Sequence, residues 1–211
     1  MNAATERFSL AGPAGAIECA RDQPAAAARG LAVLCHPHPQ FGGTLDNKVV
    51  QTLARAFAQL GYISLRFNFR GVGASAGAWD EGRGEIDDAL AVVAAQRAPG
   101  QPLVLAGFSF GGYVAAQAAA RLAAGAPAER LVLIAPAVGR FELPPVAADT
   151  LVVHGELDDV VPLTAVLAWA RPQVLPITVV PGAGHFFHGN LPVLKQVVTS
   201  AWAARPPALP S

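Results

Sequence analysis

The sequence is poor in charge and in cysteine. Asp, Glu, Lys and Arg make up 14% of its 211 residues, and the 15 basic residues balance the 15 acidic ones. With no net charge and no run of like charges, the chain offers no face suited to a phosphate backbone, so we expect no nucleic-acid partner. Its two cysteines, Cys19 and Cys35, cannot make a disulfide framework, and we expect both to be reduced thiols.

The sequence also lacks a hydrophobic run that suits a secretory leader or a membrane. Residues 1–20 carry Glu6, Arg7 and Glu18 and lack the unbroken apolar core of a secretory signal, which predicts a cytoplasmic protein. Residues 98–120 contain no charged residue, and their length alone would suggest a membrane-spanning segment. A proline and a glycine-rich cluster interrupt them, however, so they predict a strand, a turn and the start of a helix.

Hydrophobic residues make up 53% of the chain, enough for a substantial core, and the length fits a single domain over residues 1–211. Short β-type runs alternate with longer helical ones, the pattern of an α/β domain with a mostly parallel sheet. Strands are predicted at 31–37, 62–69, 102–109, 130–138, 150–156 and 176–184, and helices at 47–61, 85–97, 111–124, 163–173 and 190–204. A less regular stretch at 7–22 fits a hairpin, and the proline-rich end at 205–211 predicts a frayed tail.

The stretch GFSFGG (107–112) lies where a predicted strand meets a predicted helix. A serine in a sharp strand-to-helix turn points its hydroxyl above the sheet, and its strained backbone needs small neighbours two residues away on either side. Gly107 and Gly111 are those neighbours. The G-x-S-x-G pattern alone is common by chance, and a buried serine can simply bond a nearby carbonyl. Ser109 is therefore a candidate nucleophile, and the assignment depends on whether the sequence also supplies a base and an orienting acid.

A serine hydroxyl needs an adjacent base, and that base needs a carboxylate to orient it. The segment GAGHFFHG (182–189) follows the last predicted strand and holds two histidines. We favour His185 as the base, because the Gly-Ala-Gly turn before it can swing the ring over the strand ends. His188 lies beyond two phenylalanines and is assigned a pocket or structural part.

The orienting carboxylate is expected in HGELDD (154–159), which ends another late strand and lies between the serine and the histidine in the chain. Asp158 and Asp159 are both candidates, and we favour Asp158. The acid that does not face the histidine would be an exposed or capping residue. His154, inside the apolar strand, is interpreted as a hydrogen-bonded core residue.

An oxyanion that develops during acyl transfer needs N–H donors. One is expected from the backbone of Phe110, directly after the serine, and the second from the loop HPHPQFGG (36–43) after the first core strand. The two prolines of that loop have no N–H to give. His38 is therefore the first candidate, with Gln40 or Phe41 behind it.

The same loop contains a His-x-His pair, His36 and His38, whose spacing is compatible with zinc. No cysteine or carboxylate lies close to the pair in sequence. A loop-bracing role is therefore favoured, and we expect neither a metal nor a cofactor.

With these residues identified, the chain resembles the α/β-hydrolase superfamily, and more narrowly its small bacterial serine hydrolases without a lid. The segments that carry the resemblance appear in family order and spacing: HPHPQFGGTLDNKVV, LRFNFRGVGAS, GFSFGG, HGELDDVVP and GAGHFFHG. The resemblance implies an α/β-hydrolase fold with helices on both faces of the sheet. It matches Ser109, Asp158 and His185 to the family's triad, and Phe110 and His38 to its oxyanion donors.

The resemblance also bears on what surrounds the site. Superfamily members with a cap insert it after the strand that here is 130–138, yet only GRFELPPVAAD (139–149) precedes the next strand. That stretch is too short for a helical lid, which predicts an open site. Asn68 and Arg70 would brace loops beside the site, or Arg70 would form a structural salt bridge.

Aromatic residues near the loops suggest an apolar acyl pocket, although each of them could equally belong to the core. We expect Phe41, Phe108 and Phe186 to line it. The other aromatic candidates are Trp79, Phe141 and Phe187.

These features predict a serine hydrolase that acts on small or short-acyl carboxylic esters through an acyl-enzyme. An acyl-thioesterase, an amidase or peptidase, and an acyltransferase would use the same residues. A catalytically silent scaffold that binds a ligand or partner is disfavoured, because no triad member is missing. The expected partner is a small-molecule ester rather than a membrane. The oligomeric state stays open, although edge strands and helix faces of this fold commonly pair into homodimers.

Overall fold

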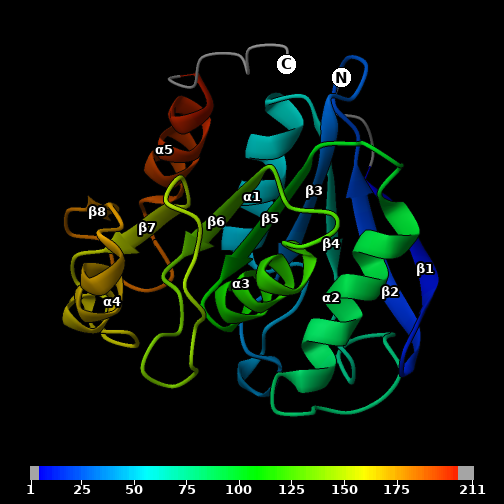
Figure 1. The fold of residues 1–211 in the computed structure, drawn as a ribbon, viewed down its shortest axis with the longest axis horizontal. Helices are drawn as coiled ribbons and strands as arrows, with labels where there is room; N and C mark the ends of the chain where they lie inside the picture. Colours follow the sequence, from blue (N-terminus) through cyan, green and yellow to red (C-terminus); the bar gives the residue numbers. More distant parts are fainter. Residues whose placement is uncertain (1–4, 204–211) are drawn as a thin grey trace.

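A central sheet of eight strands organises the molecule, and the computed structural model describes residues 5–203 (Figure 1). The strands run in the order β1-β2-β4-β3-β5-β6-β7-β8 across the sheet. The β1–β2 hairpin is antiparallel, and β2 pairs antiparallel with β4. From β4 onward in this order, each strand pairs in parallel with the next, through β3, β5, β6, β7 and β8. The bounds are β1 Glu6–Gly12, β2 Gly15–Asp22, β3 Gly30–Cys35, β4 Tyr62–Phe67, β5 Leu103–Phe108, β6 Arg130–Ile134, β7 Leu151–Gly155 and β8 Ile177–Val180.

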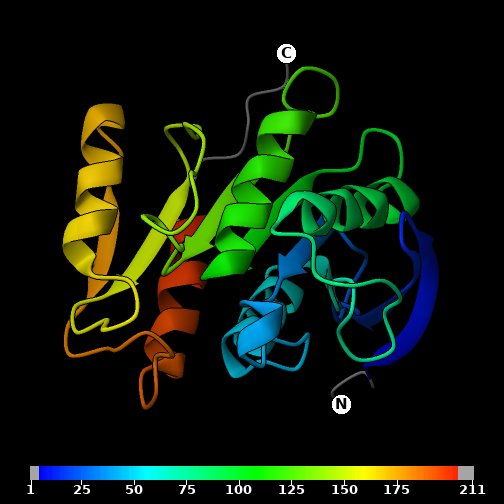
Figure 2. The same cartoon turned by 90° about the horizontal axis from the view of Figure 1, so that it is seen from below.

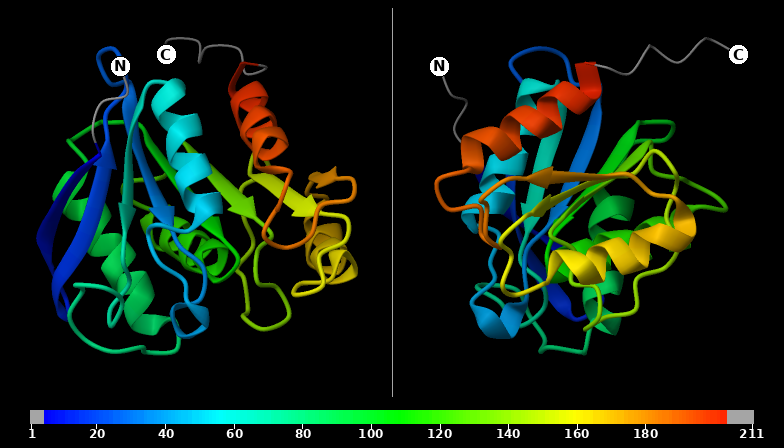
Figure 3. Two further views of the ribbon diagram at one scale, coloured as in Figure 1. Left: turned by 180° about the vertical axis from the view of Figure 1, so that it is seen from behind. Right: turned by 90° about the vertical axis from the view of Figure 1, so that its left-hand side faces the viewer.

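Helices cover both faces of the sheet (Figures 2 and 3). Helices α1 and α5 share one apolar core with one face, and α2, α3 and α4 share a second core with the other face. The central strands β3, β5 and β7 are buried along their whole length, as expected for parallel strands covered on both sides. The helix bounds are α1 Lys48–Gln59, α2 Arg83–Gln96, α3 Phe110–Leu122, α4 Leu163–Ala170 and α5 Leu191–Ala203.

The α/β fold class and the predicted order of strands and helices are confirmed, including the hairpin near the start of the chain. Local signals explain the first long helix. The Asn47 side chain accepts hydrogen bonds from the N–H groups of Val49 and Val50 at its N-terminus, and Gly61 follows its C-terminus with a φ of +88°. The frayed tail expected at 205–211 lies outside the described residues.

The connection from β6 to β7 contains no helix, and its only ladder contact is a bridge between Val138 and Phe141. The fold is therefore an α/β-hydrolase fold without a cap, as the short stretch at 139–149 predicted. Consequently no inserted cap covers the carboxyl edge of the parallel strands, where the loops after β3, β5, β7 and β8 meet. Within the described part of the chain, no helix is both long and apolar enough to cross a membrane.

Candidate active site

Ser109 occupies a strained turn between β5 and α3. Its backbone has φ +55° and ψ −117°, a left-handed conformation that non-glycine residues rarely adopt. Strand β6 and the loop after it hold this geometry in place: the Ser109 N–H donates to the carbonyl of Ile134 at 2.9 Å, and its own carbonyl accepts from the N–H of Ala137 at 3.2 Å. Such strain persists only where the surroundings determine it, and it is typical of functional turns.

The two glycines that flank the serine are required because backbone packs directly against them. A Cβ on Gly107 would lie 2.0 Å from the carbonyl oxygen of Gly111, and a Cβ on Gly111 would lie 2.2 Å from the carbonyl oxygen of Cys35. Without side chains at these positions, the first turn of α3 can seat on the ends of β5 and β3. The role expected for the glycines thus has a direct steric cause.

A continuous chain of hydrogen bonds joins Ser109, His185 and Asp158. The Nε2 atom of His185 is 3.1 Å from the Ser109 hydroxyl, and its Nδ1 atom is 2.7 Å from Oδ2 of Asp158. The other carboxylate oxygen accepts from the N–H groups of Val160 and Val161 at 2.9 and 2.7 Å. This geometry gives the imidazole a hydrogen-bond partner on each nitrogen.

The charge on Asp158 is well supported although the residue is buried. Burial alone would raise the pKa of this carboxyl, but the hydrogen bond from His185 and the N–H of Val161 outweigh it. The resulting pKa lies below the ordinary value for an aspartic acid, so the group remains ionised at neutral pH.

The loops that carry the acid and the histidine are packed against each other. The N–H of Leu157 donates to the carbonyl of Ala183 at 2.9 Å, and a Cβ on Gly155 would lie 2.4 Å from that same carbonyl oxygen. The Gly-Ala-Gly turn therefore brings His185 over the strand ends, as its sequence suggested.

The alternatives considered for these roles lie elsewhere. Asp159 and His188 are both exposed, and in the described part of the chain neither forms a hydrogen bond with His185 or Ser109. His154 is a buried residue of β7 whose Nε2–H donates to the carbonyl of Val161 at 2.9 Å. The same nitrogen is also 3.5 Å from Oδ2 of Asp158, a contact that the sequence did not predict.

The loop after β3 leaves few free backbone donors. The N–H of Gln40 donates to the Nδ1 atom of the His38 ring, and the N–H of Phe41 donates to the His38 carbonyl. Both fallback candidates for the second oxyanion donor are thus already engaged. The backbone N–H groups of His38 and Phe110 have no acceptor among the described residues, and both residues line the cavity beside Ser109.

His36 braces the same loop from inside. Its ring is fully buried, its Nδ1–H donates to the carbonyl of Pro37 at 2.6 Å, and its Nε2 accepts from the N–H of Phe69 at 3.1 Å. Burial lowers the pKa of His36 to about 4, so the ring is neutral at pH 7. Among residues 5–203, no group of three or more His, Cys, Asp or Glu side chains is arranged to hold a metal ion.

A cavity of about 330 Å³ adjoins Ser109 and His185. Two of the three expected pocket residues, Phe41 and Phe186, line it, and Phe141 does so as well. Phe108 does not, and that expectation was wrong. As the last residue of β5, Phe108 points its side chain into the core under α1 and α5, where it is fully buried and its ring centroid lies 4.9 Å from that of His185.

The remaining aromatic candidates do not line the cavity either. Phe187 is part of the same core as Phe108. Trp79 lies behind the lining, with its ring tilted against that of His38 and the ring centroids 4.4 Å apart. It therefore supports the wall of the cavity without forming it.

Arg70 and Asn68 act as structural braces on the loop after β4. The Arg70 side chain forms two hydrogen bonds with the buried carboxylate of Asp88 on α2, at 3.0 and 2.8 Å. The Asn68 side chain accepts from the N–H of Leu45 and donates to Glu18. The structural salt bridge considered for Arg70 is therefore present, and it also braces the loop after β4 by tying it to α2.

Sequence reasoning missed several residues of the cavity. Arg140, Asn47, Val160 and Val161 line it, and none was expected there. For Arg140 a signal was available. It is the first charged residue after β6, and β6 lies beside β5, the strand that leads into Ser109. Both strands end at the same edge of the sheet.

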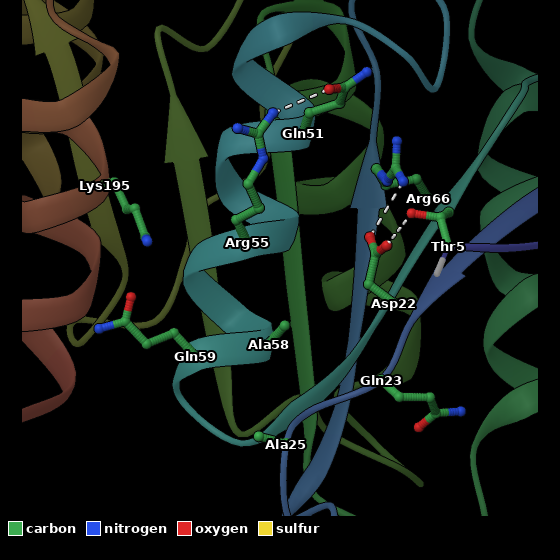
Figure 4. A pocket seen from close by; sticks show the side chains of 10 residues that line it. All are labelled: Thr5, Asp22, Gln23, Ala25, Gln51, Arg55, Ala58, Gln59, Arg66 and Lys195. Atoms are coloured by element: carbon green, nitrogen blue, oxygen red, sulfur yellow. Dashed lines mark hydrogen bonds and ion pairs between the residues drawn. The ribbon is translucent and has the colours of Figure 1, made fainter. Parts of the chain in front are cut away.

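A larger and more open cleft of about 580 Å³ lies between α1, α5 and the strands β2 and β4 (Figure 4). Its lining is polar, and its charges are partly paired: Arg66 binds Asp22 at 3.1 Å, and the hydroxyl of Thr5 donates to the same carboxylate. No serine, cysteine or histidine occurs among its described lining residues. It therefore lacks the nucleophile and base that the smaller cavity contains.

Known proteins resemble this chain in both sequence and fold. The model of a family described as serine aminopeptidase, S33, matches residues 26–146. An α/β serine hydrolase without a lid from Xanthomonas campestris is 40% identical, with a TM-score of 0.88 over 100% of this chain and 99% of its own. An α/β serine hydrolase homologue from Coxiella burnetii is 37% identical, with a TM-score of 0.81 over 92% of this chain and 96% of its own.

A curated relative gives a partial match. An uncharacterized protein of Rickettsia prowazekii is 40% identical over 109 residues. The matched stretch spans 50% of this chain and 46% of that protein, so about half of each is compared.

Proposed function

Because the chain belongs to the α/β serine hydrolases without a lid, we propose that it hydrolyses carboxylic esters with a small or short acyl group through an acyl-enzyme. The observation that carries the proposal is the hydrogen-bonded chain from Ser109 through His185 to Asp158, placed beside a largely apolar cavity. In this proposal the three residues are nucleophile, base and orienting acid.

In the first half-reaction, the Ser109 oxygen attacks the ester carbonyl carbon while Nε2 of His185 takes the hydroxyl proton. The ionised Asp158 accepts the Nδ1–H bond, fixes the tautomer of the ring and stabilises the imidazolium that forms. His185 then returns the proton to the departing alkoxide, and the alcohol leaves. The acyl group remains as an ester of Ser109.

In the second half-reaction, water takes the place of the alcohol. His185 removes a proton from the water as it attacks the acyl carbon, and returns that proton to Ser109 as the acid is released. In both steps the carbonyl oxygen becomes negative. The backbone N–H groups of Phe110 and His38 are the donors we assign to it, since their neighbours Gln40 and Phe41 are already bonded.

The description of the matched family also suggests aminopeptidase activity as an alternative function. Such an enzyme must hold the free ammonium group of a peptide, and a carboxylate commonly supplies that contact. None of the described residues that line the cavity is acidic, and one of them, Arg140, is a cation that repels an ammonium group. The cavity chemistry therefore favours an ester over a peptide.

The first test is labelling with a fluorophosphonate probe, read as a change in intact mass. We expect one adduct on the wild-type protein and none on Ser109→Ala. Ser9→Ala is the matched control, because Ser9 is exposed on the edge strand β1, and it should be labelled like wild type. Labelling of Ser109→Ala, or no labelling of the wild type, would contradict an activated Ser109.

Kinetics then separate the substrate classes. Wild type should hydrolyse 4-nitrophenyl esters from acetate to decanoate with a preference for the short chains, and Ser109→Ala should lower turnover by about 10⁴ to 10⁶. The matching acyl-thioesters and 4-nitroanilides test the thioesterase and amidase alternatives. A higher kcat/KM on either of these series than on the esters would overturn the assignment to esters.

A further inference from the structure

Arg140 is the only arginine or lysine among the described residues that line the catalytic cavity. The lining also contains no aspartate or glutamate, and Asp158 is fully covered behind His185. The rest of the wall is mainly apolar or aromatic, with Phe41, Phe141 and Phe186 as its large members. The cavity thus combines apolar walls with one positive charge.

The charge of Arg140 is not neutralised within the described part of the protein. Most of the other arginines have a carboxylate partner there, such as Arg70 with Asp88 and Arg121 with Asp87. For Arg140 no hydrogen bond or ion pair occurs among residues 5–203, and the residue is exposed. Its guanidinium therefore has its full set of donors available to a ligand.

The position of Arg140 is set by the same backbone that holds the serine. The carbonyl of Ser109 accepts the N–H of Ala137, and a tight turn follows in which the N–H of Phe141 donates to the carbonyl of Ala137 at 3.2 Å. Gly139 has a φ of +82°, which glycine adopts easily, and it completes this turn. The turn brings Phe141 into the cavity wall and holds Arg140 at the same wall.

The electrostatic effect of Arg140 reaches His38, which also lines the cavity. The pKa of His38 lies below its ordinary value, chiefly because the ring is partly buried and additionally because of the positive charge of Arg140. The positive charge of Arg140 is therefore felt at a second residue of the cavity lining.

We propose that Arg140 binds an anionic group of the substrate, so that the preferred substrates are esters that carry a carboxylate or phosphate and present an otherwise apolar body to Phe41, Phe141 and Phe186. This inference rests on the proposed esterase function and narrows its substrate class. Arg140 is a specificity-determining residue in this proposal, and the guanidinium recognises the oxygens of either anion in the same way.

Two pairs of chromogenic or ultraviolet-absorbing esters test it. In the first pair, 4-butanoyloxybenzoate carries the anion on the alcohol side, and 4-butanoyloxybenzamide is its neutral counterpart. In the second, the 4-nitrophenyl monoester of adipic acid carries the anion on the acyl side, and its methyl ester is neutral. Replacing the carboxylate by a phosphonate in the favoured pair distinguishes the two kinds of anion.

For each pair the measured quantity is the ratio of kcat/KM for the anionic ester to kcat/KM for the neutral ester. In at least one pair, Arg140→Gln should lower this ratio about tenfold relative to wild type, as expected for a lost hydrogen bond to a charged group. Arg140→Lys should keep most of the ratio. Arg171→Gln removes an equal charge from an exposed arginine outside the cavity and should leave the ratio as in wild type.

The outcomes separate this inference from the proposed function. If wild type hydrolyses the neutral esters and Arg140→Gln leaves both ratios unchanged, Arg140 does not select anions and the inference is wrong, while the esterase assignment stands. An equal fall in the ratio for Arg171→Gln would also overturn it, because the effect would then come from net charge. If wild type hydrolyses none of the four esters, both proposals fall.

Discussion

A Cβ built on Gly107 would lie 2.0 Å from the carbonyl oxygen of Gly111, four residues further along the chain. The backbone at the start of α3 thus lies against the end of β5 with no room for even a methyl group between them. Ser109 lies between the two glycines with its backbone at φ +55°. The close approach of the two backbones and the strained serine are parts of one turn.

Gly107→Ala should therefore distort this turn. We expect a loss of about 3 kcal/mol in the free energy of unfolding, the upper range for an overpacked core site, together with loss of fluorophosphonate labelling at Ser109. Chemical denaturation and intact mass measure the two effects. Gly125→Ala is the control, because a Cβ there meets nothing within 4 Å, and its unfolding free energy should change by less than about 1 kcal/mol. Wild-type labelling and stability in Gly107→Ala would show that the turn tolerates a side chain.

The adjacent acids Asp158 and Asp159 test which carboxylate orients His185. Asp158→Asn should lower kcat about 10⁴-fold, because an amide can donate to Nδ1 of His185 and favour the wrong tautomer. The asparagine oxygen can still accept the N–H groups of Val160 and Val161, so we expect the fold to persist. Asp159→Asn changes the charge equally at an exposed position and should alter kcat less than about twofold. Steady-state kinetics and circular dichroism of both variants check this, and similar losses in the two would contradict the assignment.

A second pair of adjacent acids, on α2, separates a buried salt bridge from an exposed one. The Asp88 side chain is 1% exposed and binds Arg70, whereas that of Asp87 is 50% exposed and binds Arg121. Asp88→Asn leaves the Arg70 guanidinium, which is 13% exposed, without its counter-charge and should lower the unfolding free energy by about 3 kcal/mol, the lower end for a broken buried pair. Asp87→Asn should cost at most about 1 kcal/mol. Urea unfolding measures both values, and equal losses would mean that burial does not govern the strength of these pairs.

Much of this architecture was predictable because its signals are local. Apolar runs of five or six residues, glycine after α1 and the asparagine before it each act within a few positions of the chain. The need for Gly107 and Gly111 was predictable for the same reason, because the steric demand on them comes from the strand-to-helix turn that the G-x-S-x-G pattern indicates. Choosing between Asp158 and Asp159 depended on which carboxylate leaves the strand end toward the histidine.

The errors and omissions arose where a side chain's direction depends on distant packing. Phe108 belongs to a strand that is buried on both faces, so the sequence offers no polar alternation to show which face its ring takes. Arg140 reaches the cavity through a turn that depends on hydrogen bonds from Ala137 and Phe141. The contact of His154 with Asp158 crosses between a strand and the loop after it. The position of Arg140 after β6 could have indicated the edge of the sheet, but the direction of all three side chains depends on packing and turn geometry that the sequence pattern does not show.

His36 should make stability depend on pH in a defined range. The pKa of its buried ring falls from the ordinary 6.5 to about 4 in the folded protein. Below pH 6.5 the unfolded chain takes up a proton at this ring, and the folded protein does not do so until about pH 4. The contribution of the neutral ring is therefore complete above pH 6.5, is lost as the pH falls toward 4, and changes no further below that.

At 1.36 kcal/mol for each pKa unit, this loss amounts to about 3 kcal/mol between pH 6.5 and 4. His36→Gln removes the titrating group, so its unfolding free energy, measured by urea titration at several pH values, should fall less steeply in this range than that of wild type. His188→Gln removes an exposed histidine and should keep the wild-type slope. His154 and His38, whose pKa values are also lowered by burial, remain in all three proteins and contribute equally to each slope. Parallel slopes for wild type and His36→Gln would mean that the buried ring does not resist protonation, and that its bonds to Pro37 and Phe69 rearrange at little cost.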